Sequence, residues 1–179
     1  AADYIHGNAC IRPSMQIDRL AKWAKLEKFD TKDFDDFVFL DTETTGLSGG
    51  TGTMAFMVGA ARFVDGNLEL EQFFLQNPAE ELAMLQALLR FCGEMKAVVT
   101  YNGKAFDIPI LNTRFILNGI ESPFEGLPHF DLLPVSRRVW KARLAQCNLG
   151  NVERHILGHE READEVPGYM VPEIYMDYL

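Results

Sequence analysis

The order of apolar segments in the middle of the chain constrains its fold more than any other feature. Residues 37–40 (Phe-Val-Phe-Leu) are a compact apolar run of the kind found in a central strand. A second apolar run covers residues 54–64, Asp65-Gly66 is a strong hairpin signal, and residues 68–75 begin with alternating apolar and polar side chains. These segments predict three consecutive strands that pair antiparallel.

Helical and strand-like segments alternate after the third strand. Residues 77–81 (Asn-Pro-Ala-Glu-Glu) combine a capping side chain, a proline and two acids, which is typical of a helix start. Residues 97–101 predict a short strand, residues 106–118 predict a second helix, and residues 130–133 predict a fifth strand. This order is that of a ribonuclease H-like core, so the expected fold class is α/β with a mixed five-stranded sheet.

Short helical segments flank this core. They cover residues 17–26, 136–144 and 149–157, and a last one opens at Pro172. We therefore divide the chain into an N-terminal helical extension over residues 1–35 and a ribonuclease H-like domain over residues 36–179.

The charge excludes one class of nucleic-acid-binding protein. The 179 residues include 26 acids and 17 Lys or Arg, for a net charge of −9. A chain that coats nucleic acid through bulk positive charge would be basic, so a nucleic-acid partner must be held locally or through metal ions. The three cysteines have no C-x-x-C spacing, and no apolar run reaches the ~18 residues of a membrane span. We expect a cytoplasmic protein without a membrane partner.

The strongest chemical signal is Asp41-Thr42-Glu43, directly after the first strand. Side chains two residues apart in a strand point the same way, so both carboxylates leave one face together. Such a pair, with no basic neighbour in sequence, is explained if a divalent cation neutralises it. The alternative is a solvated strand end, because a chain this acidic contains about one Asp-x-Glu by chance.

A third carboxylate is expected nearby. Asp107 falls in the first turn of the helix that follows Asn102-Gly103, where an acid also stabilises the helix dipole. In this topology the fourth strand lies beside the first, which would bring Asp107 close to Asp41 and Glu43.

These residues carry a family resemblance over residues 36–179. Residues 39–47 (Phe-Leu-Asp-Thr-Glu-Thr-Thr-Gly-Leu) resemble the first motif of the DEDD, or DnaQ-like, exonucleases, and residues 102–107 resemble the second. Four further segments resemble the YprB-type ribonuclease H-like exonuclease family: residues 49–53, 130–133, 137–140 and 166–168.

The resemblance implies a 3′→5′ exonuclease that hydrolyses phosphodiester bonds of single-stranded DNA or RNA with two Mg²⁺ or Mn²⁺ ions, roughly 3.5–4 Å apart. The catalytic metal ligands would be Asp41, Glu43 and Asp107. By the same resemblance, Thr44 and Leu47 would contact the terminal nucleotide and Asn102 would help place the substrate. Whether the strand is DNA or RNA depends on contacts to the sugar 2′ position.

The family also needs a fourth carboxylate and a His or Tyr base from a late helix. His159 and Asp164 have a fitting H-x4-D spacing, but Pro167-Gly168 would break a helix directly after Asp164. In YprB-type proteins the segment at residues 166–168 precedes the third motif. The resemblance therefore implies an exonuclease domain over residues 36–179 that is truncated at its C-terminus, with the fourth acid beyond residue 179 and a catalytically incomplete chain. His159 and Asp164 are the alternative.

Two other functions stay open. One is a nucleic-acid-binding or assembly module with lost catalysis, and the other is a ribonuclease H-like endonuclease. The basic segment at residues 137–143 favours a solvated helix face, with phosphate contact as its alternative. Asp131 favours a structural cap over a role in support of the acids.

Overall fold

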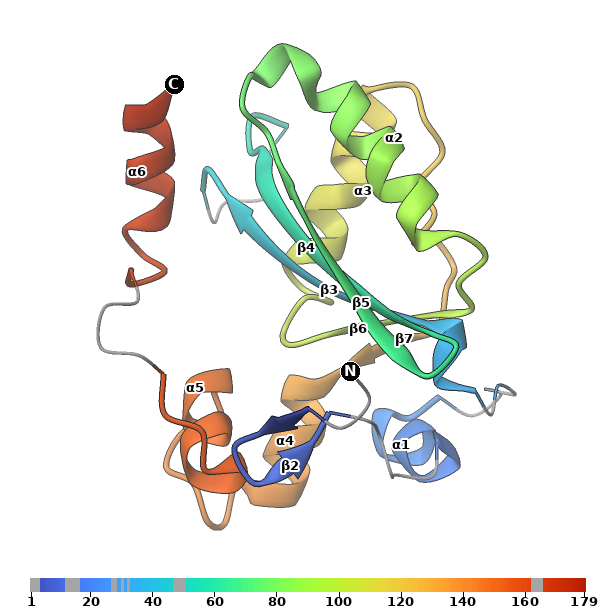
Figure 1. Cartoon of the computed structure of the whole chain (residues 1–179), viewed down its shortest axis with the longest axis vertical. Helices are drawn as coiled ribbons and strands as arrows, with labels where there is room; N and C mark the ends of the chain where they lie inside the picture. Colours follow the sequence, from blue (N-terminus) through green and yellow to red (C-terminus); the bar gives the residue numbers. More distant parts are fainter. Residues whose placement is uncertain are drawn as a thin grey trace.

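The chain folds around a five-stranded mixed sheet with helices on its two faces (Figure 1). The computed structural model describes residues 4–11, 17–26, 29, 31, 33–46, 51–161 and 166–179. The sheet has the order β5-β4-β3-β6-β7. Its strands are β3 (Phe37–Thr44), β4 (Ala55–Val64), β5 (Asn67–Phe74), β6 (Ala97–Thr100) and β7 (His129–Asp131). The predicted fold class, α/β with a mixed five-stranded sheet, is confirmed.

The first three strands form the predicted antiparallel meander. Asp41 of β3 pairs with Gly59 of β4, and the turn from β4 to β5 is Asp65-Gly66. Both turn residues have positive φ, 50° and 76°, which is the backbone of a two-residue hairpin turn whose twist matches that of the strands. On its other side β3 pairs parallel with β6, with Phe39 opposite Val99.

Strand alternation divides the core into two layers. Even-numbered residues of β3, such as Val38 and Leu40, are buried against α2 (Glu81–Cys92) and α3 (Asp107–Leu117). Phe37 lies in a second cluster with Ile17 and Ala21 of α1 (Ile17–Ala24). Figure 1 shows α2 and α3 on one side of the sheet and α1 and α4 (Leu132–Trp140) on the other.

The two helices of the first layer are joined by a buried ion pair. The guanidinium of Arg114 on α3 donates to both carboxylate oxygens of Glu81 on α2, at 2.5 and 2.6 Å. Asn118 Nδ2 donates to the same carboxylate at 2.7 Å. The paired side chains are only 12% and 8% exposed, so each charge depends on the other for its neutralisation.

The last third of the chain follows the prediction with one shift. Asp131 Oδ1 accepts from the Leu133 backbone N–H at 3.0 Å, so β7 ends at Asp131 and α4 begins at Leu132, not at residue 136 as predicted. Pro134 fits this first turn because its missing N–H would have had no helical partner. The expected cap at Asp131 is confirmed.

The remaining elements lie outside the sheet. Helix α5 (Leu149–Val152) runs into a π-helical turn (Glu153–Leu157), and α6 (Val171–Tyr178) starts next to Pro172 as predicted. The sequence pattern did not reveal the small hairpin of β1 (Ile5–His6) and β2 (Ala9–Cys10). Within the described ranges, no helix is both long enough and apolar enough to span a membrane.

Asp131 also holds the turn between β6 and α3. Its Oδ1 accepts from the Asn102 N–H at 2.8 Å, and its Oδ2 accepts from the Lys104 N–H at 3.2 Å. Asp131 is 9% exposed, so one buried carboxylate accepts from three backbone N–H groups of two segments. Such charge-assisted bonds are among the stronger hydrogen bonds in proteins.

We predict that Glu81→Ala lowers the free energy of unfolding by about 3 kcal/mol, because it leaves the buried Arg114 guanidinium without its carboxylate. Urea denaturation followed by circular dichroism measures the change. The matched control is Glu69→Ala, whose pair with Arg62 is 48% and 32% exposed. The control should change stability by less than about 1 kcal/mol. Equal losses for the two variants would contradict the role of the buried pair.

A second prediction concerns the carboxylate between the two segments. Asp131→Ala should lower the free energy of unfolding by about 3 kcal/mol, because three backbone N–H groups lose their acceptor. Asp131→Asn keeps one carbonyl oxygen and should lose less. Asp177→Ala on the exposed side of α6 serves as the control, with a change within about 0.5 kcal/mol. The same urea titration would speak against the assignment if the Ala variant matched this control.

Candidate active site

A small pocket of about 180 Å³ opens at the end of β3, beside the first turn of α3. Its lining includes four of the residues expected from the sequence: Asp41, Thr44, Asn102 and Asp107. They come from β3, from the turn after β6 and from the start of α3. Segments more than sixty residues apart in sequence therefore meet at one end of the sheet.

Parallel pairing explains why these residues meet. Because Phe39 lies opposite Val99, Asp41 emerges at the same level as Tyr101, one residue past the end of β6. The chain then turns at Asn102, which has a φ of 72°, a left-handed conformation that asparagine adopts more readily than most residues. The turn brings the chain back to start α3 at Asp107.

The turn is shaped to admit the Asp107 carboxylate. Asp107 is 8% exposed, and its Oδ1 accepts a hydrogen bond of 2.5 Å from Thr42 Oγ1. A Cβ at Gly103 would lie 2.6 Å from Asp107 Oδ2 and 2.6 Å from Thr100 Cβ, closer than real Cβ contacts. Only glycine at this position leaves Asp107 where it is.

The three predicted carboxylates repel one another. Partial burial raises the pKa of Asp41, and the negative charge of Asp107 raises it further, while a hydrogen bond from the Thr42 backbone and the charge of Arg161 lower it. The pKa of Glu43 is raised by partial burial and then by the charges of Asp41 and Asp107. Although Asp41 reaches the solvent, burial and neighbouring negative charge make ionisation of Asp41 and Glu43 less favourable than that of an isolated carboxyl group.

The donor set fits a hard divalent cation, but the ligands are not assembled as they stand. Carboxylate oxygens are the ligands that Mg²⁺ and Mn²⁺ prefer. Across the part of the chain that the structure describes, no group of three or more His, Cys, Asp or Glu side chains is placed to hold a metal ion. Asp107 is turned to Thr42, and Glu43 is not among the described residues that line the pocket. Coordination of an ion by all three would require their side chains to move.

Other predicted residues lie elsewhere or cannot be placed. Leu47 and Asp164 lie outside the described residues. The His159 ring packs against the His6 ring of β1, with centroids 3.8 Å apart, and lines a different pocket together with Arg154 and Arg161. The structure therefore does not bring His159 into the pocket of Asp41.

The basic segment of α4 is largely solvent-exposed. Arg137, Lys141 and Arg143 are exposed, as a solvated face predicts. Arg138 is also exposed, but it makes a structural contact. Its guanidinium donates to the backbone carbonyl of Trp23 and thereby connects α4 to α1.

Five of the nine described residues that line the pocket were not predicted as site residues, and two of them, Thr42 and Tyr101, make hydrogen bonds there. Strand alternation points Thr42 away from the side of Asp41 and Glu43, so periodicity gave no reason to select it, yet it holds Asp107. Tyr101 lines the pocket, and its hydroxyl donates to the Cys147 carbonyl at 2.5 Å. Burial raises the pKa of the Tyr101 hydroxyl above its usual range. Its signal in the sequence was its position at the end of a predicted strand.

Comparison with known proteins places the chain in a family. Residues 38–179 match a family model described as the RNase_H superfamily. The chain is 40% identical over 148 residues to the uncharacterized protein YprB of Bacillus subtilis (strain 168). This match covers 81% of the chain and 35% of the relative, so the chain spans about a third of that relative's length.

Solved structures agree on the fold. Exonuclease I of E. coli, in its zinc-bound complex with single-stranded DNA, superposes with a TM-score of 0.56 at 19% identity, over 80% of this chain and 40% of that one. Exonuclease I in complex with a dT13 oligonucleotide gives the same TM-score and identity, over 79% and 40% of the two chains. At this identity the likeness shows the fold alone, whereas the family match covers most of the chain. The protein belongs to the RNase_H superfamily and is of the YprB type.

Proposed function

We propose that this protein is a metal-dependent nuclease of the DnaQ-like type, which removes nucleotides from the 3′ end of single-stranded nucleic acid. The observation that carries the proposal is the meeting of Asp41, Asp107 and Asn102 in one pocket at the end of the central strand. The family membership and the fold support it, because exonuclease I has the same fold and was solved with single-stranded DNA and with zinc.

Asp41, Glu43 and Asp107 would hold two divalent cations, Mg²⁺ or Mn²⁺. The raised pKa values of Asp41 and Glu43 support this assignment, since a cation would relieve the repulsion that causes part of each shift. When bound, the ions would lower the pKa of an attacking water and neutralise charge on the scissile phosphate. A phosphate would otherwise be repelled by this acidic pocket.

The other pocket residues would orient the end of the strand. Thr44 Oγ1 donates its proton to the Gly46 carbonyl at 3.0 Å, so towards a substrate this oxygen can only accept. A sugar hydroxyl at the strand terminus is the matching donor. Asn102, held in its turn by Asp131, would present its side-chain amide to the same nucleotide, and Leu47 would contact its base or sugar.

The fourth carboxylate and the general base remain part of the proposal. Asp164 with His159 is one candidate pair, and an acid beyond residue 179 is the other. His159 would have to leave the ring of His6 to act at the pocket.

Metal binding tests the proposal without requiring catalysis. We expect Mn²⁺ to bind the wild-type chain in isothermal titration calorimetry. Asp41→Asn and Asp107→Asn should weaken this binding by at least about 10-fold, since each removes a charged ligand. Asp177→Asn, which removes a carboxylate from α6, should bind Mn²⁺ like the wild type. The metal assignment is wrong if all four proteins bind the ion equally.

Cleavage of end-labelled strands separates the candidate functions. With Mn²⁺ and a 3′- or 5′-labelled oligonucleotide, a DnaQ-like nuclease shortens the strand stepwise from its 3′ end. The assay uses a longer chain that also supplies the fourth acid, because residues 1–179 are expected to be catalytically incomplete. Asp41→Asn should reduce the rate by at least about 100-fold, because it removes a ligand of the ions that activate the water and neutralise the phosphate. A 100-fold loss corresponds to about 2.8 kcal/mol of transition-state stabilisation. Internal cuts would instead favour an endonuclease, and binding without cleavage would favour a nucleic-acid-binding module.

The raised pKa values predict an unusual response to pH. A carboxyl whose pKa is higher in the folded than in the unfolded state opposes folding above that folded pKa. This penalty disappears as the pH falls through the folded pKa towards the unfolded one. Without metal, Asp41→Asn should therefore melt at a higher temperature than the wild type at pH 7, and the gap should close on acidification.

Saturation with Mn²⁺ should reverse this order. The ion stabilises the wild type by about 2.7 kcal/mol when its concentration is 100 times the dissociation constant, and it stabilises the variant less. Differential scanning fluorimetry with and without Mn²⁺, at pH 7 and pH 5, measures both effects. A variant that is less stable than the metal-free wild type at pH 7 would contradict the electrostatic analysis.

A further inference from the structure

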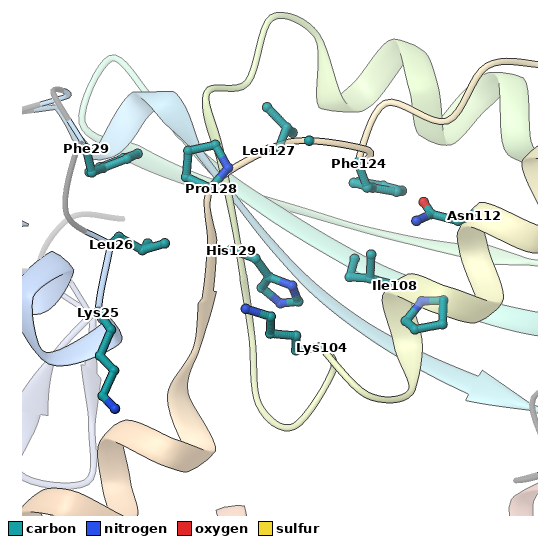
Figure 2. A pocket seen from close by; sticks show the side chains of 12 residues that line it. Lys25, Leu26, Phe29, Lys104, Ile108, Asn112, Phe124, Leu127, Pro128 and His129 are labelled. Carbon is teal, nitrogen blue, oxygen red and sulfur yellow. The ribbon is translucent and has the colours of Figure 1, made fainter.

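A large groove lies on the other side of the first turn of α3 from the Asp41 pocket. It holds about 740 Å³ and is bounded by the end of α1, the start of β7 and the residues that begin α3 (Figure 2). Asp107 lines the small pocket, whereas the next residue, Ile108, lines the groove. The two hollows are therefore separated by a single helical turn.

The described lining of this groove is positively charged. It contains the ammonium groups of Lys25 and Lys104 and no carboxylate, in a chain with a net charge of −9. Both lysines are exposed, and within the described residues neither forms an ion pair. Figure 2 shows Lys104 beside the His129 ring. Burial lowers the pKa of His129, and the positive charge of Lys104 lowers it by a smaller amount. Among the described residues of the lining, a negative ligand would meet two cations and no carboxylate.

The groove also offers flat apolar surface. Phe29 is half-buried in its wall, and its ring is fixed by edge contacts with Phe37 and Phe130 at centroid distances of 5.5 and 4.8 Å. Pro109 and Pro128 line the same space. A ligand that fits has an anionic group and a planar apolar part, which describes a nucleotide. Sites for single strands combine these two features, a cationic groove and aromatic stacking surfaces.

The groove continues along α1 and comes close to the Asp41 pocket at its other end. A second hollow of about 630 Å³ shares Lys25 and Phe29 with it and adds Lys22 and Asp18 along α1. At the other end, Asn102 lines the Asp41 pocket and Lys104 lines the groove. Because Asn102 and Lys104 are two residues apart in sequence, their Cα atoms are separated by at most about 7 Å. The two hollows share no described lining residue, so a strand that ends in the small pocket would pass over the turn at residues 102–104 to enter the groove.

We infer that the groove defined by Lys22, Lys25, Phe29 and Lys104 binds the body of a single-stranded nucleic acid whose end lies at Asp41 and Asp107. This inference rests on the proposed function. Lys25 and Lys104 contact phosphates of the strand, and Phe29 offers a stacking surface for a base. The protein thus holds its substrate locally, although its overall charge repels nucleic acid.

The test compares strands that can and cannot reach the groove. Fluorescence anisotropy measures the affinity of a labelled dinucleotide and of an oligothymidylate of about 15 nucleotides, with Ca²⁺ present, over a range of salt concentrations. For the long strand, Lys25→Gln with Lys104→Gln should make the slope of log K against log salt shallower by about 1.4, about 0.7 for each lost phosphate contact. The dinucleotide should bind this variant and the wild type equally.

The control removes the same charge elsewhere. Arg90→Gln with Lys96→Gln neutralises two exposed cations, one on α2 and one before the opposite end of β6. Its slope should equal that of the wild type. Because all four exchanged side chains are exposed, a urea midpoint near that of the wild type is expected and shows that the variants fold.

The outcomes separate the groove from the nuclease site. If the lysine variant and the control have the same slope, or if the wild type does not bind the long strand, the groove assignment is wrong even where Asp41-dependent cleavage occurs. If thymidine monophosphate displaces the long strand from the groove at equal concentration, the groove is a mononucleotide site and the inference is again wrong. Lysine-dependent binding of the long strand without Asp41-dependent binding of Mn²⁺ would keep the groove and reject the proposed nuclease.

Discussion

The parallel pairing of β3 with β6 is the constraint on which the candidate site depends. It aligns the ends of two strands that the chain reaches only after a meander and a helix, and it places Asp41 level with the turn that leads into α3. Parallel strands need such a long crossover connection. Residues 41 and 107 meet because that connection returns the chain to the other side of β3. The contacts between β3 and the segment after β6, such as the hydrogen bond from Thr42 to Asp107, depend on this connection.

The turn after β6 determines where the Asp107 carboxylate lies in the site. Asn102 takes a left-handed conformation, Gly103 leaves room for the Asp107 carboxylate, and Asp131 of β7 accepts from two N–H groups of the turn. The same turn faces both hollows, since Asn102 lies at the acidic pocket and Lys104 at the cationic groove. The buried Asp131 carboxylate thus holds the turn that lies between the acidic pocket and the cationic groove.

Much of the fold was predictable because local patterns agree with the tertiary structure. The apolar run at residues 37–40 begins β3, the Asp65-Gly66 turn joins β4 to β5, and Asn77 caps a 3₁₀ turn (Pro78–Glu80) that leads into α2. Each is specified by side chains close in sequence. The start of α4 was predicted too late, because the capping bond from Asp131 ends β7 early. The hairpin of β1 and β2 has only two residues in each strand, too few for any periodic pattern.

The sequence by itself determined the order of the elements, and strand periodicity with a family-like motif singled out Asp41, Glu43 and Asp107 as candidate metal ligands. It could not indicate that Asp107 would bond to Thr42, because alternation along β3 assigns Thr42 to the other side of the strand. Nor could it reveal the groove, whose lysines stand at positions 25 and 104, each unremarkable in its own segment. Their proximity exists only after α1 packs against β7 and α4, because a charged surface is a property of the folded arrangement and not of any local run of residues.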